Sequence, residues 1–306
     1  MNQFNRRNFI KATSAGIFGF AIEPVSFLEL KKKIPRLSFS TLGCPDWSFD
    51  KILDFAVAHQ YKAIEFRGIL RQLDLTKCIE FSTPENIAAS LKKIKDKKLQ
   101  VINLGCSSEL HFAEGAERTK NLEGAKNFIQ LAQQLNCPYI RVFPNKFPAT
   151  QSKKESIDLI IKGLVELGNF GEAYNVSVLM ETHGDVIYTE DIKNIIELAN
   201  HKNVGLIWDV VNMWTGTKEP VAAVYHQLKK HIRHVHIKDV KLMNDKERFV
   251  VIGKGDTPIF EAISVLKKDG YKGFYSFEWE KLWHPDIEEP EFALDHYSRT
   301  MQQLFL

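Results

Sequence analysis

The dominant feature of the chain is an alternation of short apolar runs with longer amphipathic stretches, repeated eight times after Arg36. The apolar runs have the length of strands, and the amphipathic stretches have helical spacing, as Ile87, Leu91 and Ile94 show. The predicted strands are 37–41, 63–67, 101–105, 139–143, 176–181, 204–209, 233–238 and 273–279. The predicted helices are 49–60, 84–98, 119–136, 153–174, 192–200, 220–231, 258–268 and 289–306.

This pattern predicts an α/β fold with a parallel sheet, because helices between strands carry the chain back across the sheet. Eight such units in one domain of about 270 residues predict a closed (β/α)8 TIM barrel. The alternative is an open doubly wound sheet. The first predicted strand, however, is followed by Thr-Leu-Gly-Cys-Pro at 41–45 and not by a glycine-rich phosphate loop. No change in composition divides residues 36–306, so we expect one barrel domain there.

Residues 1–35 have the features of an export signal and linker. The pair Arg6-Arg7 is followed by Phe9, an aliphatic residue and Lys11, and then by a weakly apolar stretch from 12 to 22. This segment resembles a Tat-type signal, which implies export to the periplasm. Its apolar stretch is shorter than the roughly 18 residues of a membrane span, so no stable span is expected. Retention as an uncleaved anchor stays open, as does the cleavage site.

The charge distribution argues against a nucleic-acid partner. The net charge is +3, but residues 1–36 hold seven basic and two acidic residues. That local balance of +5 leaves residues 37–306 at −2. A folded domain with this charge lacks the basic surface on which nucleic-acid binding depends.

Ionisable residues gather where the last four predicted strands end. They are Glu181, Asp209, His236 and Glu278. The carboxyl ends of barrel strands form the active site and converge toward the axis. Three carboxylates meeting there would repel one another unless a cation neutralised them. This oxygen-rich set with one imidazole predicts a divalent metal, with Mn²⁺ favoured over Mg²⁺, Co²⁺ or Zn²⁺.

The same residues resemble the xylose isomerase-like barrel superfamily, often called sugar phosphate isomerase/epimerase. The resemblance covers residues 36–306 and includes Gly-Lys-Gly-Asp at 253–256 and Gly-Tyr-Lys-Gly at 270–273, before the last strand. In the epimerase branch, a Glu, an Asp, a His and a Glu at the four matching positions hold the metal. The resemblance implies that Glu181 and Glu278 are also the catalytic acid and base, on opposite faces of a substrate carbon.

One position departs from that pattern. Many epimerases have a substrate-contacting histidine three residues after the Asp of strand six, where this chain has Asn212. An amide can hydrogen-bond a hydroxyl but does not titrate near neutral pH. The departure leaves the particular sugar and the reacting position open.

Further candidates for substrate binding lie close to these strand ends. Lys238 follows His236 by two residues and is placed to stabilise an enediolate. Glu65 and Arg67 lie at the end of strand two, and we expect them to line the pocket or to form an ion pair with each other. Arg141 on strand four is expected to form an ion pair inside the barrel. The predicted substrate-binding set is His183, Asn212, Lys238, Glu65, Trp279 and Lys281.

The sequence thus predicts a metal-dependent sugar isomerase or epimerase that removes a proton next to a carbonyl. Its partner would be a small sugar or sugar-like ketone, and a homo-oligomer is possible. The closest alternative is a hydro-lyase or eliminase acting on inosose or 3-keto-glycosides, since it shares the proton-abstraction step. A non-catalytic sugar-binding protein and an endonuclease IV-like nuclease are the remaining alternatives.

Overall fold

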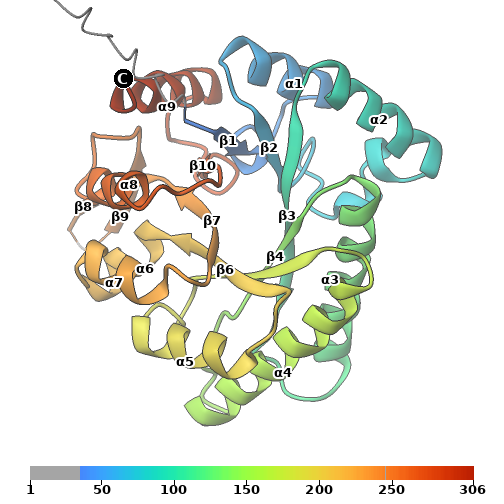
Figure 1. Ribbon diagram of the computed structural model, residues 1–306, viewed down its shortest axis with the longest axis vertical. Helices are drawn as coiled ribbons and strands as arrows, with labels where there is room; N and C mark the ends of the chain where they lie inside the picture. Colours follow the sequence, from blue (N-terminus) through green and yellow to red (C-terminus); the bar gives the residue numbers. More distant parts are fainter. Residues whose placement is uncertain (1–34, 245) are drawn as a thin grey trace, which may run out of the picture. The chain divides into compact units, whose positions relative to one another are not determined.

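The computed structural model describes residues 35–244 and 246–306, so nearly all of the expected signal segment lies outside the described residues. The barrel strands are β1 (Leu37–Ser40), β2 (Ala63–Phe66), β3 (Gln100–Glu109), β4 (Tyr139–Phe143), β5 (Ser177–Glu181), β6 (Val204–Asp209), β7 (Ile232–Ile237) and β10 (Tyr275–Phe277). They close into a barrel in the order β1-β10-β7-β6-β5-β4-β3-β2 (Figure 1). Every neighbouring pair is parallel, which confirms the predicted (β/α)8 fold.

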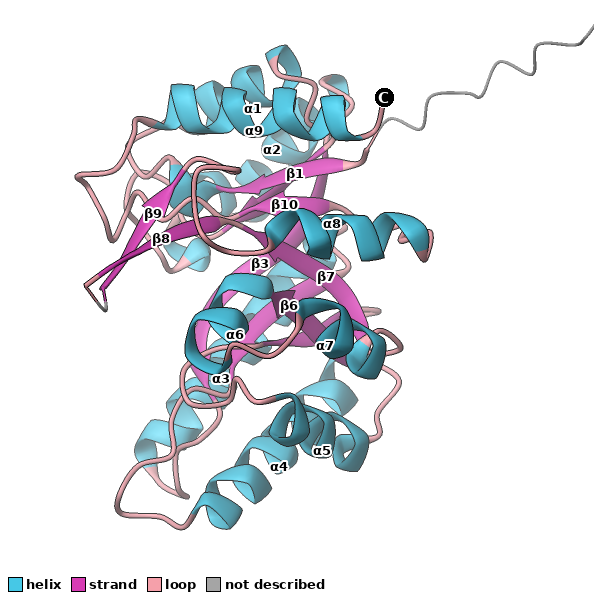
Figure 2. Cartoon of the chain, turned by 90° about the vertical axis from the view of Figure 1, so that its left-hand side faces the viewer, coloured by secondary structure: helices cyan, strands magenta, loops and turns pink. Residues whose placement is uncertain are grey.

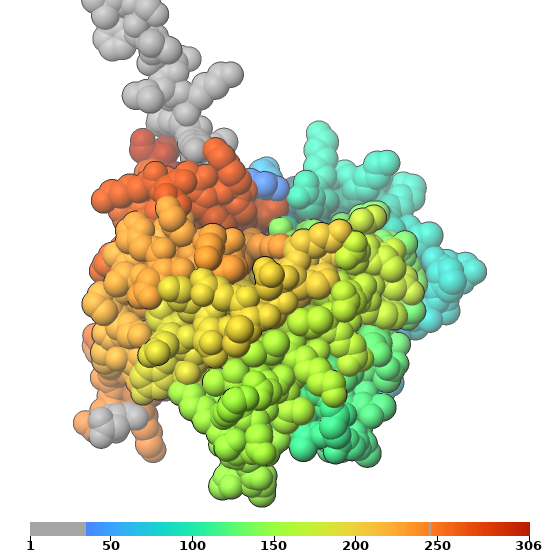
Figure 3. Space-filling model, turned by 60° about the horizontal axis from the view of Figure 1, so that its bottom comes forward, coloured from blue at the N-terminus to red at the C-terminus, as the bar shows by residue number. Residues whose placement is uncertain are grey.

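Helices follow the strands and form the outer layer. They are α1 (Phe49–Ala58), α2 (Pro84–Asp96), α3 (Ala116–Gln134), α4 (Lys153–Glu172), α5 (Thr189–Ala199), α6 (Val210–Thr217), α7 (Val221–Leu228), α8 (Ile259–Lys268) and α9 (Pro290–Leu304). Several begin at strong caps: Ser152 and Glu155 form a reciprocal capping box at the start of α4. None of the helices in the described ranges is long and apolar enough to cross a membrane. Figure 3 shows segments coloured from green to orange forming a continuous surface on one face of the molecule.

Two features were not predicted from the sequence. An antiparallel hairpin, β8 (Asp239–Met243) and β9 (Lys246–Val250), follows β7 and projects from the barrel (Figure 2). Its strands are largely exposed and carry charged residues, so the apolar pattern of a barrel strand is missing. Helix α6 begins directly after β6, because the Asp209 side chain accepts a hydrogen bond from the backbone N–H of Asn212 and caps the helix.

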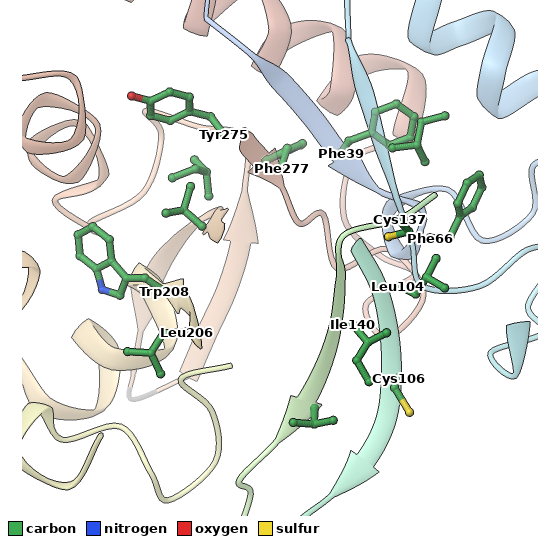
Figure 4. Packing of buried hydrophobic residues seen from close by; sticks show 14 of the residues in the cluster. Phe39, Phe66, Leu104, Cys106, Cys137, Ile140, Leu206, Trp208, Tyr275 and Phe277 are labelled. Carbon is green, nitrogen blue, oxygen red and sulfur yellow. The ribbon is translucent and has the colours of Figure 1, made fainter. Parts of the chain in front are cut away.

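The core has two parts that follow from the alternation of side chains along each strand. Outward-facing apolar residues such as Phe39, Leu104 and Trp208 pack beneath the helices (Figure 4). Inward-facing residues are polar to an unusual degree, and several are fully buried: Ser38, Ser40, Asn103, His234 and Ser276. The barrel interior is therefore built for polar chemistry and not only for packing.

Candidate metal centre

The four predicted metal ligands come together at the carboxyl end of the barrel. Glu181 ends β5, Asp209 ends β6, His236 lies near the end of β7, and Glu278 directly follows β10. The strand register pairs Asp209 with His236, which places the set at one level. One ligand atom from each residue lies within 4.8 Å of the others, and none of the four is more than 3% exposed. The geometry is that of a site that could hold a metal ion.

The orientation of His236 fits a cation at this position. Its Nδ1 lies 3.3 Å from Glu278 Oε1, 3.7 Å from Glu181 Oε1 and 3.8 Å from Asp209 Oδ2. This Nδ1 is buried and has no hydrogen-bond partner among the described residues. The other ring nitrogen, Nε2, lies 3.1 Å from both carboxylate oxygens of Glu65. Burial lowers the pKa of His236, but the surrounding carboxylates outweigh it and raise the pKa well above its usual value, so the ring is charged when no metal is bound. A bound cation would take the place of the proton on Nδ1, while Nε2 keeps its contact with Glu65.

Lys238 supplies a positive charge on one side of the cluster. Its Nζ lies 2.8 Å from Asp209 Oδ2, 2.8 Å from Glu278 Oε2 and 2.8 Å from Glu280 Oε1. Glu280 was not predicted as a site residue, although it lies two residues beyond Glu278 and therefore on the same face of the chain. The surrounding carboxylates outweigh the effect of burial and raise the pKa of Lys238 well above its usual value.

Arg141 supplies the second positive charge. Its Nη1 lies 2.6 Å from Glu181 Oε2 and 4.0 Å from Glu278 Oε1, so the predicted ion pair inside the barrel is formed. Burial and Glu278 raise the pKa of Glu181, but Arg141 and His236 outweigh them and lower it to about 2. Burial raises the pKa of Asp209 to about 7, because its contact with Lys238 does not fully compensate. Glu181 is thus held ionised, while Asp209 gains a proton readily when no metal ion is bound.

Glu65 contacts the ring nitrogen of His236 that faces away from the cluster of carboxylates. Its Oε2 lies 2.9 Å from Nε2 of His234, and the side chain is 1% exposed. With both oxygens engaged by histidines, Glu65 has the geometry of a residue that orients His236, in place of the substrate contact expected from the sequence. Glu65, His234 and His236 also have metal-ligand spacing, which their mutual hydrogen bonds account for. His234 was missed, although its position two residues before His236 places it on the same face.

Asn212 and His183, both predicted to bind substrate, lie beside Glu181. Asn212 Nδ2 donates to Glu181 Oε1 at 3.3 Å and to the Thr182 carbonyl at 3.1 Å. Nδ1 of His183 lies 3.0 Å from Oδ1 of Asn145. Burial lowers the pKa of His183, so its ring is neutral near pH 7. Both remain candidates for binding substrate.

Trp279 and Lys281 do not occupy the positions expected of substrate contacts. The Trp279 indole has no exposed surface, stacks on Phe277 with 5.7 Å between ring centroids, and donates from Nε1 to the Glu288 carbonyl. It therefore packs in the core. The ammonium group of Lys281 donates to the carbonyls of Pro285 and Ile287, which ties together the loop before α9.

The comparisons with known proteins agree with this fold. The sequence profile described as "Xylose isomerase-like TIM barrel" matches residues 53–301. No curated protein matches the sequence.

Solved structures show the same architecture at low identity. An IOLI protein with a bound zinc atom has 18% identity and a TM-score of 0.74, with 88% of this chain and 98% of that chain covered. The probable 3-DHS dehydratase AsbF from Bacillus anthracis has 18% identity and a TM-score of 0.71, with coverages of 87% and 98%. The 3-keto-D-glucoside 4-epimerase YcjR from E. coli has 15% identity and a TM-score of 0.68, with coverages of 88% and 99%.

Proposed function

Because the chain belongs to the xylose isomerase-like TIM barrel family, we propose that it is a divalent-metal-dependent isomerase or epimerase acting on a small sugar or sugar-like ketone. The observation that carries this proposal is the convergence of Glu181, Asp209, His236 and Glu278 in one buried cluster. Solved structures of the same fold are described as a 3-keto-D-glucoside 4-epimerase and a D-psicose 3-epimerase with D-tagatose, which supports the substrate class.

A divalent cation held by these four residues would polarise a substrate carbonyl and ease loss of the proton on the neighbouring carbon. Glu181 and Glu278 are the residues to move that proton, because their strands approach the centre from two sides, with β6 and β7 between them. In an epimerisation, one carboxylate takes the proton, and the other, which has first taken up a proton from solvent, delivers it to the opposite face. Return to the neighbouring carbon gives aldose–ketose isomerisation.

The surrounding charges suit this role. The ion pairs with Arg141 and Lys238 keep Glu181 and Glu278 ionised in the free protein, so either can act as the base, and the partner that acts as the acid must first be protonated. His236 and Lys238 outweigh the effect of burial and hold the pKa of Glu278 well below its usual value. The near-complete burial of the cluster excludes water, which strengthens these interactions.

Elimination is the second candidate, and Lys238 favours it. This ammonium group stays protonated and lies 2.8 Å from Glu278 Oε2. If Glu278 removes a proton, Lys238 is placed to donate one to a departing hydroxyl or alkoxide on the neighbouring carbon. The likeness to a probable dehydratase supports keeping this reaction beside epimerisation.

Deuterium exchange distinguishes these reactions. Residues 36–306 loaded with Mn²⁺ are incubated in D₂O with ketoses, inosose and 3-keto-glucosides, and the products are identified by NMR. We expect deuterium at one carbon next to the carbonyl, and the product identifies an epimer, an isomer or an eliminated species. Glu181→Gln and Glu278→Gln should abolish the exchange. Full turnover by both variants would show that the assigned acid and base are wrong.

Metal identity and location are also proposals. The oxygen-rich ligand set favours Mn²⁺, and metal analysis of protein purified from its own host tests this. The N-terminal Arg6-Arg7 motif supports Tat export, and replacing both arginines by lysine should leave the protein in the cytoplasmic fraction. Light scattering tests whether the protein forms a homo-oligomer.

A further inference from the structure

Arg67 is a buried cation whose charge the proposed mechanism does not use. It directly follows β2 on the inward face of the barrel and is 6% exposed. Among the described residues, its guanidinium makes one hydrogen bond, from Nη2 to the Ser107 hydroxyl at 2.9 Å, and no ion pair with a carboxylate. Its Nη1 is buried without a partner. Burying an unpaired charge is costly, so the fold retains Arg67 at the expense of stability.

The position of Arg67 is fixed from two directions. The Thr41 hydroxyl accepts hydrogen bonds from the backbone N–H of Arg67 at 2.9 Å and of Gly68 at 3.1 Å. Ser107 holds the far end of the side chain. A residue held at its backbone and at its guanidinium is pre-organised for a ligand and loses little freedom on binding one.

A second guanidinium with free donors lies beside it. Arg141 uses Nη1 for Glu181, while its Nε and Nη2 are buried without partners among the described residues. The ring of Phe143 stacks on this guanidinium at 3.9 Å.

Gly105 lets the two arginines approach. A Cβ atom at Gly105 would lie 2.7 Å from Arg67 Cδ and 3.2 Å from Arg141 Nη2. The bare backbone of β3 therefore leaves room for both side chains at the end of the barrel.

We propose that Arg67 and Arg141 bind an anionic group of the substrate, a carboxylate or a phosphate, next to the proposed metal site. This inference rests on the proposed function and narrows its substrate class to acidic sugars or ketones. Three unpartnered N–H-bearing atoms on two adjacent guanidinium groups match the oxygens of such an anion.

The charges around the two arginines favour an anion over a neutral hydroxyl. Burial and the neighbouring Arg141 lower the pKa of Arg67 to about 10, whereas for Arg141 the carboxylates of Glu181 and Glu278 outweigh burial and raise the pKa. Both groups are therefore charged at neutral pH. Two adjacent cations repel each other, and a bound anion relieves that repulsion. Arg141 already has Glu181 as a partner, which leaves Arg67 as the cation that most lacks one.

The test compares three probes that differ at one carbon: D-fructose, D-fructuronate and D-fructose 6-phosphate. Calorimetry measures their binding to the Mn²⁺-loaded protein and to Arg67→Met, Arg67→Lys and Arg233→Met. Arg233 is the matched control, because it also donates to a serine hydroxyl, that of Ser177, but lies at the amino end of β7. Thermal unfolding and Mn²⁺ titration establish that each variant is folded and holds metal.

We expect at least one anionic probe to bind about tenfold or more tightly than D-fructose. Arg67→Met should remove that preference and leave D-fructose binding unchanged, Arg67→Lys should keep part of it, and Arg233→Met should keep all of it. The better of the two anions identifies carboxylate or phosphate as the group recognised. If Arg67→Met does not fold, Gly105→Ala serves as the second variant. Its Cβ displaces both arginines, so it should also reduce the preference for the anion.

Equal affinities for the three probes, or an anion preference that survives in Arg67→Met, would overturn the inference. Such a result with deuterium exchange intact on a neutral ketose leaves the proposed function standing. Conversely, anion binding that depends on Arg67, without exchange on any substrate, supports the anion site and contradicts the proposed reaction.

Discussion

Glu65 and His236 form a carboxylate–imidazole pair in which both oxygens of Glu65 lie 3.1 Å from Nε2 of His236. The pair crosses the barrel interior from β2 to β7, and neither side chain is more than 1% exposed. Its effect is to turn Nδ1 toward the cluster of carboxylates. A residue distant in sequence thus sets the direction in which the proposed metal ligand points.

Replacement of Glu65 should weaken metal binding without removing a ligand. We expect Glu65→Ala to lower the affinity for Mn²⁺ by about 10–100-fold, because the His236 ring loses the acceptor that fixes its tautomer. Glu65→Gln, which retains an acceptor oxygen, should lose less. Calorimetric titration of metal-free protein with Mn²⁺ measures both values. Wild-type affinity in Glu65→Ala would show that His236 needs no such support.

Glu278 and Glu280 provide a matched pair for the ligand assignment. Both contact Lys238 at 2.8 Å, but Glu278 alone lies in the four-residue cluster. Mn²⁺ at 100 times its dissociation constant should stabilise the wild-type protein by about 2.7 kcal/mol. Glu280→Gln should keep most of this increment, and Glu278→Gln should lose it. Urea unfolding with and without Mn²⁺ measures the increment, and equal losses in the two variants would contradict the assignment.

The barrel and the four-residue cluster could be predicted from the sequence because both depend on periodic features. Alternating strands and helices identify the fold, and the carboxyl ends of parallel strands meet at one end of it. The positions of four residues at the ends of predicted strands were therefore enough to predict the cluster: Glu181, Asp209, His236 and Glu278. The hairpin β8–β9 lacked such a signal, because its strands are exposed and rich in charge.

The partners of each side chain could not be predicted, because they depend on which residues meet across the barrel. Glu65 was expected at a substrate position, but it reaches His234 and His236 on the far side. Trp279 follows the last strand, yet its ring turns outward onto Phe277. The unpaired state of Arg67 likewise appears only when its neighbours after β1 and on β3 and β4 are known.

Asp295 should contribute to stability in a pH-dependent manner. Its Oδ1 lies 2.8 Å from His59 Nδ1 and 2.9 Å from Arg299 Nε, and the contact with His59 joins α9 to the residue that follows α1. Burial raises the pKa of Asp295, but hydrogen bonds from Arg299 and His59 outweigh it and lower the pKa below its usual value. A carboxyl group with a lowered pKa stabilises the fold above the unfolded-state pKa of about 3.9, and this contribution is lost at lower pH.

We therefore expect Asp295→Asn to lower the free energy of unfolding by up to about 1 kcal/mol at pH 7. The difference from wild type should shrink as the pH falls below about 4. Urea unfolding at several pH values measures it. Asp158→Asn is the control and should change stability less, because among the described residues this carboxyl pairs with Lys154 alone, on the surface of α4. A difference that grows at low pH would contradict the assigned direction of the shift.

Lys238 should matter most when the metal is absent. Its ammonium group lies against Asp209, Glu278 and Glu280, so Lys238→Met leaves three buried carboxyl groups without that cation. Removing one partner of a buried ion pair costs about 3–5 kcal/mol, and we expect a loss of this size in metal-free protein. Mn²⁺ should stabilise Lys238→Met more than wild type, because the cation replaces part of the missing positive charge. Equal Mn²⁺ increments in the two proteins, measured by urea unfolding, would show that Lys238 does not balance the charge of the metal cluster.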